Sequence, residues 1–194
     1  CAGNQRKELF YTLQAAEQAK KIYANAEAYT DYTCALELLD QIETESQNED
    51  QLYVIRSQRF EVLKGRGEVS YTMGNILDGQ ADLRALLPLA RQMQDDPAWT
   101  IDALLMQPEV NRPDTQTVLQ PALGMASEAL VLAEQIKDAN RQLKSLMALS
   151  SIQSMLRSPE YYQTSEKCLE LARQLGDRSA EVDLLLALGS ASGM

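Results

Sequence analysis

The 194-residue chain contains no histidine, and it is poor in glycine, proline and aromatic residues. Without histidine it lacks the base of Ser-His and Cys-His catalytic pairs and the commonest ligand of catalytic zinc. Nine glycines and six prolines are too few for a loop-rich fold, and only 6% of the residues are aromatic. A core of mainly Leu, Ala and Met suits helix packing better than a β-sandwich. The scarcities therefore favour an all-α protein that is not an enzyme.

Cysteine is scarce as well, with Cys1, Cys34 and Cys168 alone. Cys34 and Cys168 fall in helical patterns far apart, and the chain has no Asn-x-Ser/Thr sequon, so a secreted disulfide framework is not expected. We predict reduced thiols in a cytoplasmic protein. The alternative is a lipid-anchored envelope protein, because Cys1 followed by small residues resembles the start of a mature bacterial lipoprotein; excision from a longer chain explains the same start.

Basic residues are outnumbered, 18 against 28 acidic ones, which gives a net charge of −10. Nucleic acids and anionic membranes would be repelled at long range, so neither is an expected partner. The longest apolar run, residues 184–188, ends at Gly189, far short of the roughly 20 residues that cross a bilayer. Two acidic pairs, Glu49-Asp50 and Asp95-Asp96, precede helical patterns and are interpreted as caps rather than metal ligands. No cofactor or metal site is expected.

What the chain does contain is a repeat. Four similar segments begin with leucine at intervals of 51, 43 and 39 residues: Leu38-Leu39-Asp40-Gln41-Ile42, Leu89-Ala90-Arg91-Gln92-Met93, Leu132-Ala133-Glu134-Gln135-Ile136 and Leu171-Ala172-Arg173-Gln174-Leu175. The interval shortens toward the C-terminus into the range typical of helix-pair repeats, in which each unit buries its apolar face against the next.

The apolar periodicity predicts helices throughout and no sustained strand alternation. Expected helices cover about residues 5–22, 28–43, 51–64, 75–93, 115–137 and 139–156, and a short one lies around 99–105. Another begins at Ser158-Pro159 and ends at Gly176, and the last begins at about 178. Gly65 and Gly67 are interpreted as helix terminators, with a loop following to Gly74. Asp96-Pro97, Asp138, Ser158-Pro159 and Gly176-Asp177 are interpreted as helix starts and stops.

The second helix of each unit resembles that of tetratricopeptide repeats, with a small residue, an aromatic four later and an alanine three after that. Ala28, Tyr32 and Ala35 match this pattern. Three further triplets diverge from it: Gly79, Leu83, Leu86; Ala122, Ala126, Ala129; and Tyr161, Ser165, Cys168. The intervals and the Leu-Ala-x-Gln-x-Gly-Asp linker resemble the longer variety of bacterial regulators of the maltose-activator type.

The resemblance implies a right-handed superhelical solenoid of antiparallel helix pairs. We expect about four and a half units, in a single domain over residues 1–194 that continues past Met194 in a longer array. The last helix then has no successor to cover it. Leu184, Leu185 and Leu188 should be partly exposed and should favour self-association.

The family uses its first helices to line a concave groove, and this directs the choice of binding residues. Arg56 and Arg59 share a face and are candidates for holding a carboxylate of a bound peptide, although a solvated face paired with Glu61 or other acids explains them as well. In the fourth unit the groove-facing candidates are Lys144, Met147, Ser151 and Ser154, whose spacing also fits an exposed helix edge.

The resemblance implies binding of peptides, protein segments or small effectors. We therefore predict a non-enzymatic scaffold for protein–protein or peptide binding, within a larger signalling or transcription regulator. The alternative is a ligand-sensing domain that binds a small effector or signalling peptide and changes shape around it.

Overall fold

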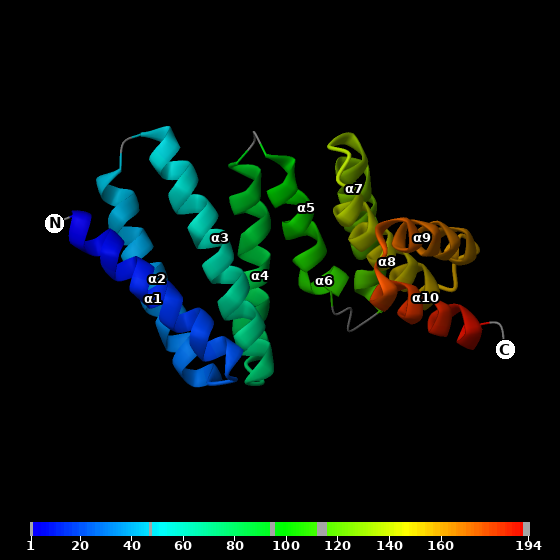
Figure 1. The fold of residues 1–194 in the computed structure, drawn as a ribbon, viewed down its shortest axis with the longest axis horizontal. Helices are drawn as coiled ribbons and strands as arrows, with labels where there is room; N and C mark the ends of the chain where they lie inside the picture. Colours follow the sequence, from blue (N-terminus) through cyan, green and yellow to red (C-terminus); the bar gives the residue numbers. More distant parts are fainter. Residues whose placement is uncertain (1, 47, 94–95, 112–115, 192–194) are drawn as a thin grey trace. The chain divides into compact units, whose positions relative to one another are not determined.

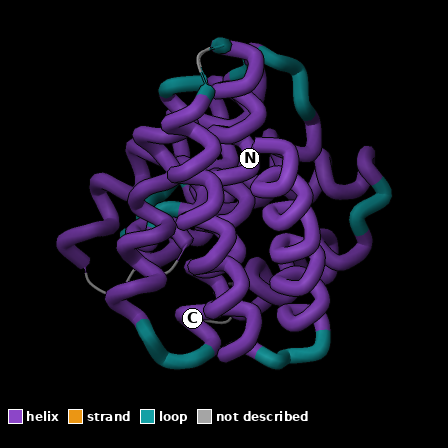
Figure 2. Tube along the Cα trace, turned by 90° about the vertical axis from the view of Figure 1, so that its left-hand side faces the viewer, coloured by secondary structure: helices purple, strands orange, loops and turns teal. Residues whose placement is uncertain are grey.

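A computed structural model describes residues 2–46, 48–93, 96–111 and 116–191. These residues form helices and no strand, as Figure 2 shows, which confirms the all-α prediction. Contacts divide the chain into an N-terminal unit, residues 1–94, and a C-terminal unit, residues 95–194. The single domain, its right-handed superhelix and its continuation past Met194 stay predictions.

The N-terminal unit contains four helices that pack in chain order, each against the next. They are α1 (Ala2–Lys21), α2 (Asn25–Glu45), α3 (Glu49–Thr72) and α4 (Ile76–Arg91), as drawn in Figure 1. Short connections between such helices make neighbours antiparallel. This is the predicted arrangement of consecutive pairs.

The C-terminal unit repeats the arrangement after a short beginning. Its helices are α5 (Pro97–Met106), α6 (Pro108–Asn111), α7 (Gln116–Gln135), α8 (Ala139–Met155), α9 (Tyr161–Leu175) and α10 (Arg178–Ala191). The small α6 packs against α7, and α7 to α10 pack each against the next. The predicted start at Thr115 lies outside the described residues.

Helix starts that depend on a capping aspartate are where the sequence predicts them. The side chain of Asp96 accepts a hydrogen bond from the backbone N–H of Ala98, that of Asp138 from Arg141, and that of Asp177 from Ala180, each at 3.0 Å. Capping needs only a few neighbouring residues in the sequence, which is why these positions could be recognised locally.

The third helix contradicts the prediction that Gly65 and Gly67 end it. α3 continues to Thr72, and both glycines are buried inside it. A Cβ at Gly65 would lie 2.5 Å from Cζ of Tyr32, and one at Gly67 would lie 3.0 Å from Leu83. The glycines therefore allow α2 and α4 to approach α3 closely, and the actual turn is short, at Gly74 with φ +82°.

A smaller error concerns the start of α9. Ser158 and Pro159 lie in the preceding turn, and the helix begins two residues later, at Tyr161, after Glu160. Glu160 makes no side-chain cap to the helix; instead the hydroxyl of Ser158 donates a hydrogen bond to its carboxylate. A Ser-Pro pair thus marks the turn here rather than the cap.

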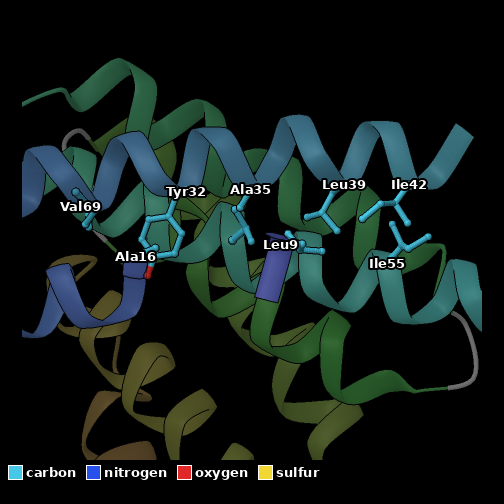
Figure 3. Close-up of a cluster of buried hydrophobic side chains, with 10 residues drawn as sticks. Leu9, Ala16, Tyr32, Ala35, Leu39, Ile42, Ile55 and Val69 are labelled. Atoms are coloured by element: carbon cyan, nitrogen blue, oxygen red, sulfur yellow. The ribbon is translucent and has the colours of Figure 1, made fainter. Parts of the chain in front are cut away.

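The positions of the tetratricopeptide-like triplets coincide with buried positions of the core. All twelve triplet residues are buried, including Ala35 and Ala129 at 0% exposure. Figure 3 shows part of this core in the N-terminal unit, with Tyr32, Ala35 and Leu39 of α2 among the side chains of α1 and α3. The spacing found in the sequence thus selects the packed face of each second helix.

The last helix differs in part from its prediction. Leu184 is only 6% exposed, because it packs with Cys168 and Ala180 in the core of the C-terminal unit, so its predicted exposure is wrong. Leu185 and Leu186 are 46% and 68% exposed. The predicted partial exposure is therefore confirmed for Leu185 and for Leu188, which is half-buried, and Leu186 adds an exposed leucine that was not predicted.

Candidate functional site

A cavity of about 290 Å³ lies in the C-terminal unit between α8 and α10. Both helices pack against α9, and the cavity is the space between these two alternate helices. We call it the C-terminal cavity. It is lined by Met147, Ser150, Ser151, Ser154 and Met155 of α8, Tyr161 of α9, and Asp183, Leu184 and Ala187 of α10.

Helical spacing explains why these side chains face the cavity. Met147, Ser151 and Ser154 follow each other at intervals of four and three residues, which places them on one face of α8. Asp183 and Ala187 are four apart on α10 and share a face in the same way. Two stripes of side chains therefore form the walls.

The inner part of the cavity is firmly packed. Ser150, Tyr161 and Leu184 are at most 8% exposed. The hydroxyls of Ser150 and Ser165 share a hydrogen bond of 2.7 Å, which joins α8 to α9 beside the cavity. The packing of α8 against α9 thus fixes the inner wall. The outer lining residues Ser151, Ser154 and Met155 are exposed.

Three of the four residues predicted in this unit line the cavity together: Met147, Ser151 and Ser154. Lys144 is exposed one turn earlier on α8 and is not among the lining residues. Sequence reasoning missed Asp183, which lies 39 residues after Lys144, the same interval that separates the last two repeats. Applying that interval to the groove-facing positions would have found it.

A second cavity, of about 340 Å³, lies in the N-terminal unit between α1 and α3. We call it the N-terminal cavity. Leu9, Ile42 and Ile55 are nearly fully buried and form its apolar floor, and Figure 3 shows Ile42 and Ile55 pointing toward each other. The remaining lining residues are Arg6, Asp50, Gln51, Val54 and Gln58.

The arginines predicted for this unit lie elsewhere. Neither Arg56 nor Arg59 lines the N-terminal cavity. The guanidinium of Arg59 donates hydrogen bonds to Asp40 at 2.6 Å and to Glu43 at 2.7 Å, which ties α3 to α2. Arg56 lies 3.6 Å from the exposed carboxylate of Glu49. Arg59 is therefore engaged by acids of its own unit, as the alternative interpretation expected.

Two further arginines hold helices together. Arg66 of α3 pairs with both carboxylate oxygens of Asp82 of α4, at 2.8 and 2.7 Å, and Asp82 is 5% exposed. Arg141 of α8 donates hydrogen bonds to both carboxylate oxygens of Asp102 of α5, at 3.0 and 2.7 Å. Hydrogen bonds to these carboxylates raise the pKa of both guanidinium groups. Such bidentate pairs fix geometry between helices and leave little capacity for a ligand.

The two described thiols are unpaired, as predicted, and differ in environment. Cys34 is exposed and Cys168 is buried. Burial raises the pKa of the Cys168 thiol to about 11, so it stays protonated at neutral pH and is a poor nucleophile. It packs as a small apolar residue. Cys1, and with it the lipid-anchor alternative, lies outside the described residues.

No group of three or more Cys, Asp or Glu side chains in the described part of the chain is arranged to hold a metal ion. None of the helices described here is both long and apolar enough to pass through a membrane. Comparison of the chain with protein-family models and with curated proteins found no match.

Proposed function

We propose that the protein is a non-enzymatic scaffold that binds a protein or peptide segment, and that the C-terminal cavity receives part of that segment. One observation carries the proposal: Met147, Ser151 and Ser154 line a single cavity between alternate helices. Methionine is flexible and polarisable and suits contact surfaces that adapt to a partner. Serine hydroxyls can donate to and accept from a peptide main chain.

The size of the cavity favours a side chain over a free small molecule. Sites for drug-sized ligands usually measure about 300–1,000 Å³ and enclose most of the ligand. The C-terminal cavity, at about 290 Å³, lies just below this range, and the N-terminal cavity, at about 340 Å³, lies near its lower end. A peptide that lies along the helices and inserts one or two side chains fits these volumes better than an effector, which the sensing alternative requires.

From the resemblance to tetratricopeptide repeats, we expect such a scaffold to be part of a larger cytoplasmic signalling or transcription regulator. This wider setting stays a prediction that depends on the sequence pattern alone.

Selection from a random dodecapeptide phage library on the full chain tests the proposal. The matched variants are Ser151→Trp, which fills the C-terminal cavity with an indole, and Gln174→Trp, which adds the same ring at an exposed position of α9 outside it. We expect wild type and Gln174→Trp to enrich the same peptides and Ser151→Trp to lose them. If Ser151→Trp, with unchanged helix content, retains the same peptides, the proposal is wrong.

A further inference from the structure

Among the described residues that line the C-terminal cavity, one carries a charge, Asp183. We infer that the cavity selects a lysine or arginine side chain of the bound segment, with the aliphatic stem inside and the cationic group on Asp183. The inference rests on the proposed peptide-binding function and specifies the chemistry of its ligand.

The carboxylate of Asp183 is available for such a contact. It makes no hydrogen bond or ion pair with any residue in the described part of the chain, and the side chain is exposed. The other acidic residue of α10, Glu181, is engaged by Arg173 at 2.8 Å. Asp177, just before the helix, caps it. Contacts within the fold occupy those two carboxylates, whereas that of Asp183 stays open to a ligand.

The walls suit the aliphatic part of a basic side chain. Met147, Met155 and Leu184 supply apolar surface, and long basic side chains bury their methylene stems on such surface while the charge stays in water. Ser151 and Ser154 add hydroxyl oxygens that can accept hydrogen bonds from an ammonium or guanidinium group. A lysine or arginine therefore finds both a stem surface and a counter-charge here, whereas an acidic side chain would meet like charge.

The surrounding charge refines the expected peptide. Lys144 holds the same repeat position on α8 that Asp183 holds on α10, 39 residues later. A peptide residue near Lys144 should consequently be neutral or acidic. The net charge of −10 attracts basic segments at long range. The N-terminal cavity, lined by both Arg6 and Asp50, gives no such preference for one sign.

Charge substitutions in the same phage selection test the inference. The variants are Asp183→Asn, which removes the charge, Asp183→Lys, which reverses it, and Glu170→Gln, which removes an exposed carboxylate of α9 outside the cavity. Peptides that Ser151→Trp loses are scored for basic residues. An exposed charge contact of this kind amounts to a preference in binding of up to roughly fivefold.

We expect wild type and Glu170→Gln to enrich lysine and arginine over glutamine at one position, by up to about fivefold. Asp183→Asn should lose that preference, and Asp183→Lys should favour acidic residues. If cavity-dependent peptides show no basic preference, or keep it in Asp183→Asn, the inference is overturned while the peptide-binding function stands. If no peptide depends on the cavity, the proposed function fails and the inference fails with it.

Discussion

Replacing Gly65 by alanine should destabilise the protein, although alanine is the better helix former. The added methyl group would lie 2.5 Å from Cζ, 2.6 Å from the hydroxyl oxygen and 2.9 Å from Cε1 of Tyr32. The ring cannot easily move away, because Tyr32 is 1% exposed and its hydroxyl donates a 2.5 Å hydrogen bond to Glu17. The helices α2 and α3 would have to separate.

Two opposing effects set the magnitude. Overpacking a core costs about 1–3 kcal/mol, and Gly to Ala inside a helix recovers roughly 1 kcal/mol. Contacts below 3 Å with a fixed ring place the overpacking cost near the top of its range. We therefore expect the free energy of unfolding to fall by about 1–2 kcal/mol in Gly65→Ala. Urea unfolding followed by circular dichroism measures this as a lower midpoint at unchanged slope.

Gly124 supplies the matched control. It lies inside α7 and is exposed, and a Cβ there would meet no atom within 4 Å. Gly124→Ala should raise stability by about 0.5–1 kcal/mol. In a Tyr32→Leu background, which removes the ring, the loss caused by Gly65→Ala should shrink. If Gly65→Ala is as stable as wild type while Gly124→Ala behaves as stated, the close approach of α2 and α3 is refuted.

Three further predictions concern other parts of the chain. Ala129→Leu, at a fully buried position of α7, should cost about 1–3 kcal/mol in urea unfolding; an unchanged midpoint would argue against the register. Ellman's reagent at pH 8 should label Cys34 quickly and Cys168 only on unfolding, because burial raises the pKa of the latter; equal rates would contradict this. If the protein self-associates through the exposed Leu185 and Leu186, Leu186→Glu should give a monomer in sedimentation velocity, and an unchanged oligomer would exclude this face.

Local signals were enough to predict most helices. The capping aspartates Asp96, Asp138 and Asp177 act on amides two or three residues away, so their effect can be recognised in a short window of sequence. The triplets of the second helices also predicted the buried face, because a 3.6-residue period fixes which side chains share a side.

Features that depend on a neighbouring helix were missed. Glycine commonly ends a helix, so the sequence suggests that Gly65 and Gly67 are terminators. Only the closeness of Tyr32 and Leu83 shows that glycine is needed inside α3. The alternative of pairing with acids was open for Arg59, but which acids it contacts, Asp40 and Glu43 of α2, depends on how two helices cross. Such contacts involve residues distant in sequence, for which helical periodicity carries no information.

Of the candidate site, the sequence predicted one wall and missed the other. The face of α8 that carries Met147, Ser151 and Ser154 followed from one helix and its repeat register. The opposite wall, with Asp183, belongs to another helix, and recognising it requires the 39-residue interval to be applied to each groove position. The burial of Leu184 depends on packing against α9 and could not be inferred from α10 alone.

A methyl nuclear magnetic resonance titration tests the central claim most directly. The full chain, labelled at its methionine methyl groups, is titrated with a synthetic peptide obtained from the phage selection. The account predicts that the resonances of Met147 and Met155, which line the C-terminal cavity, shift with the binding curve while those of Met73 and Met93 in the N-terminal unit do not. Saturable binding that leaves Met147 and Met155 unshifted would contradict the account.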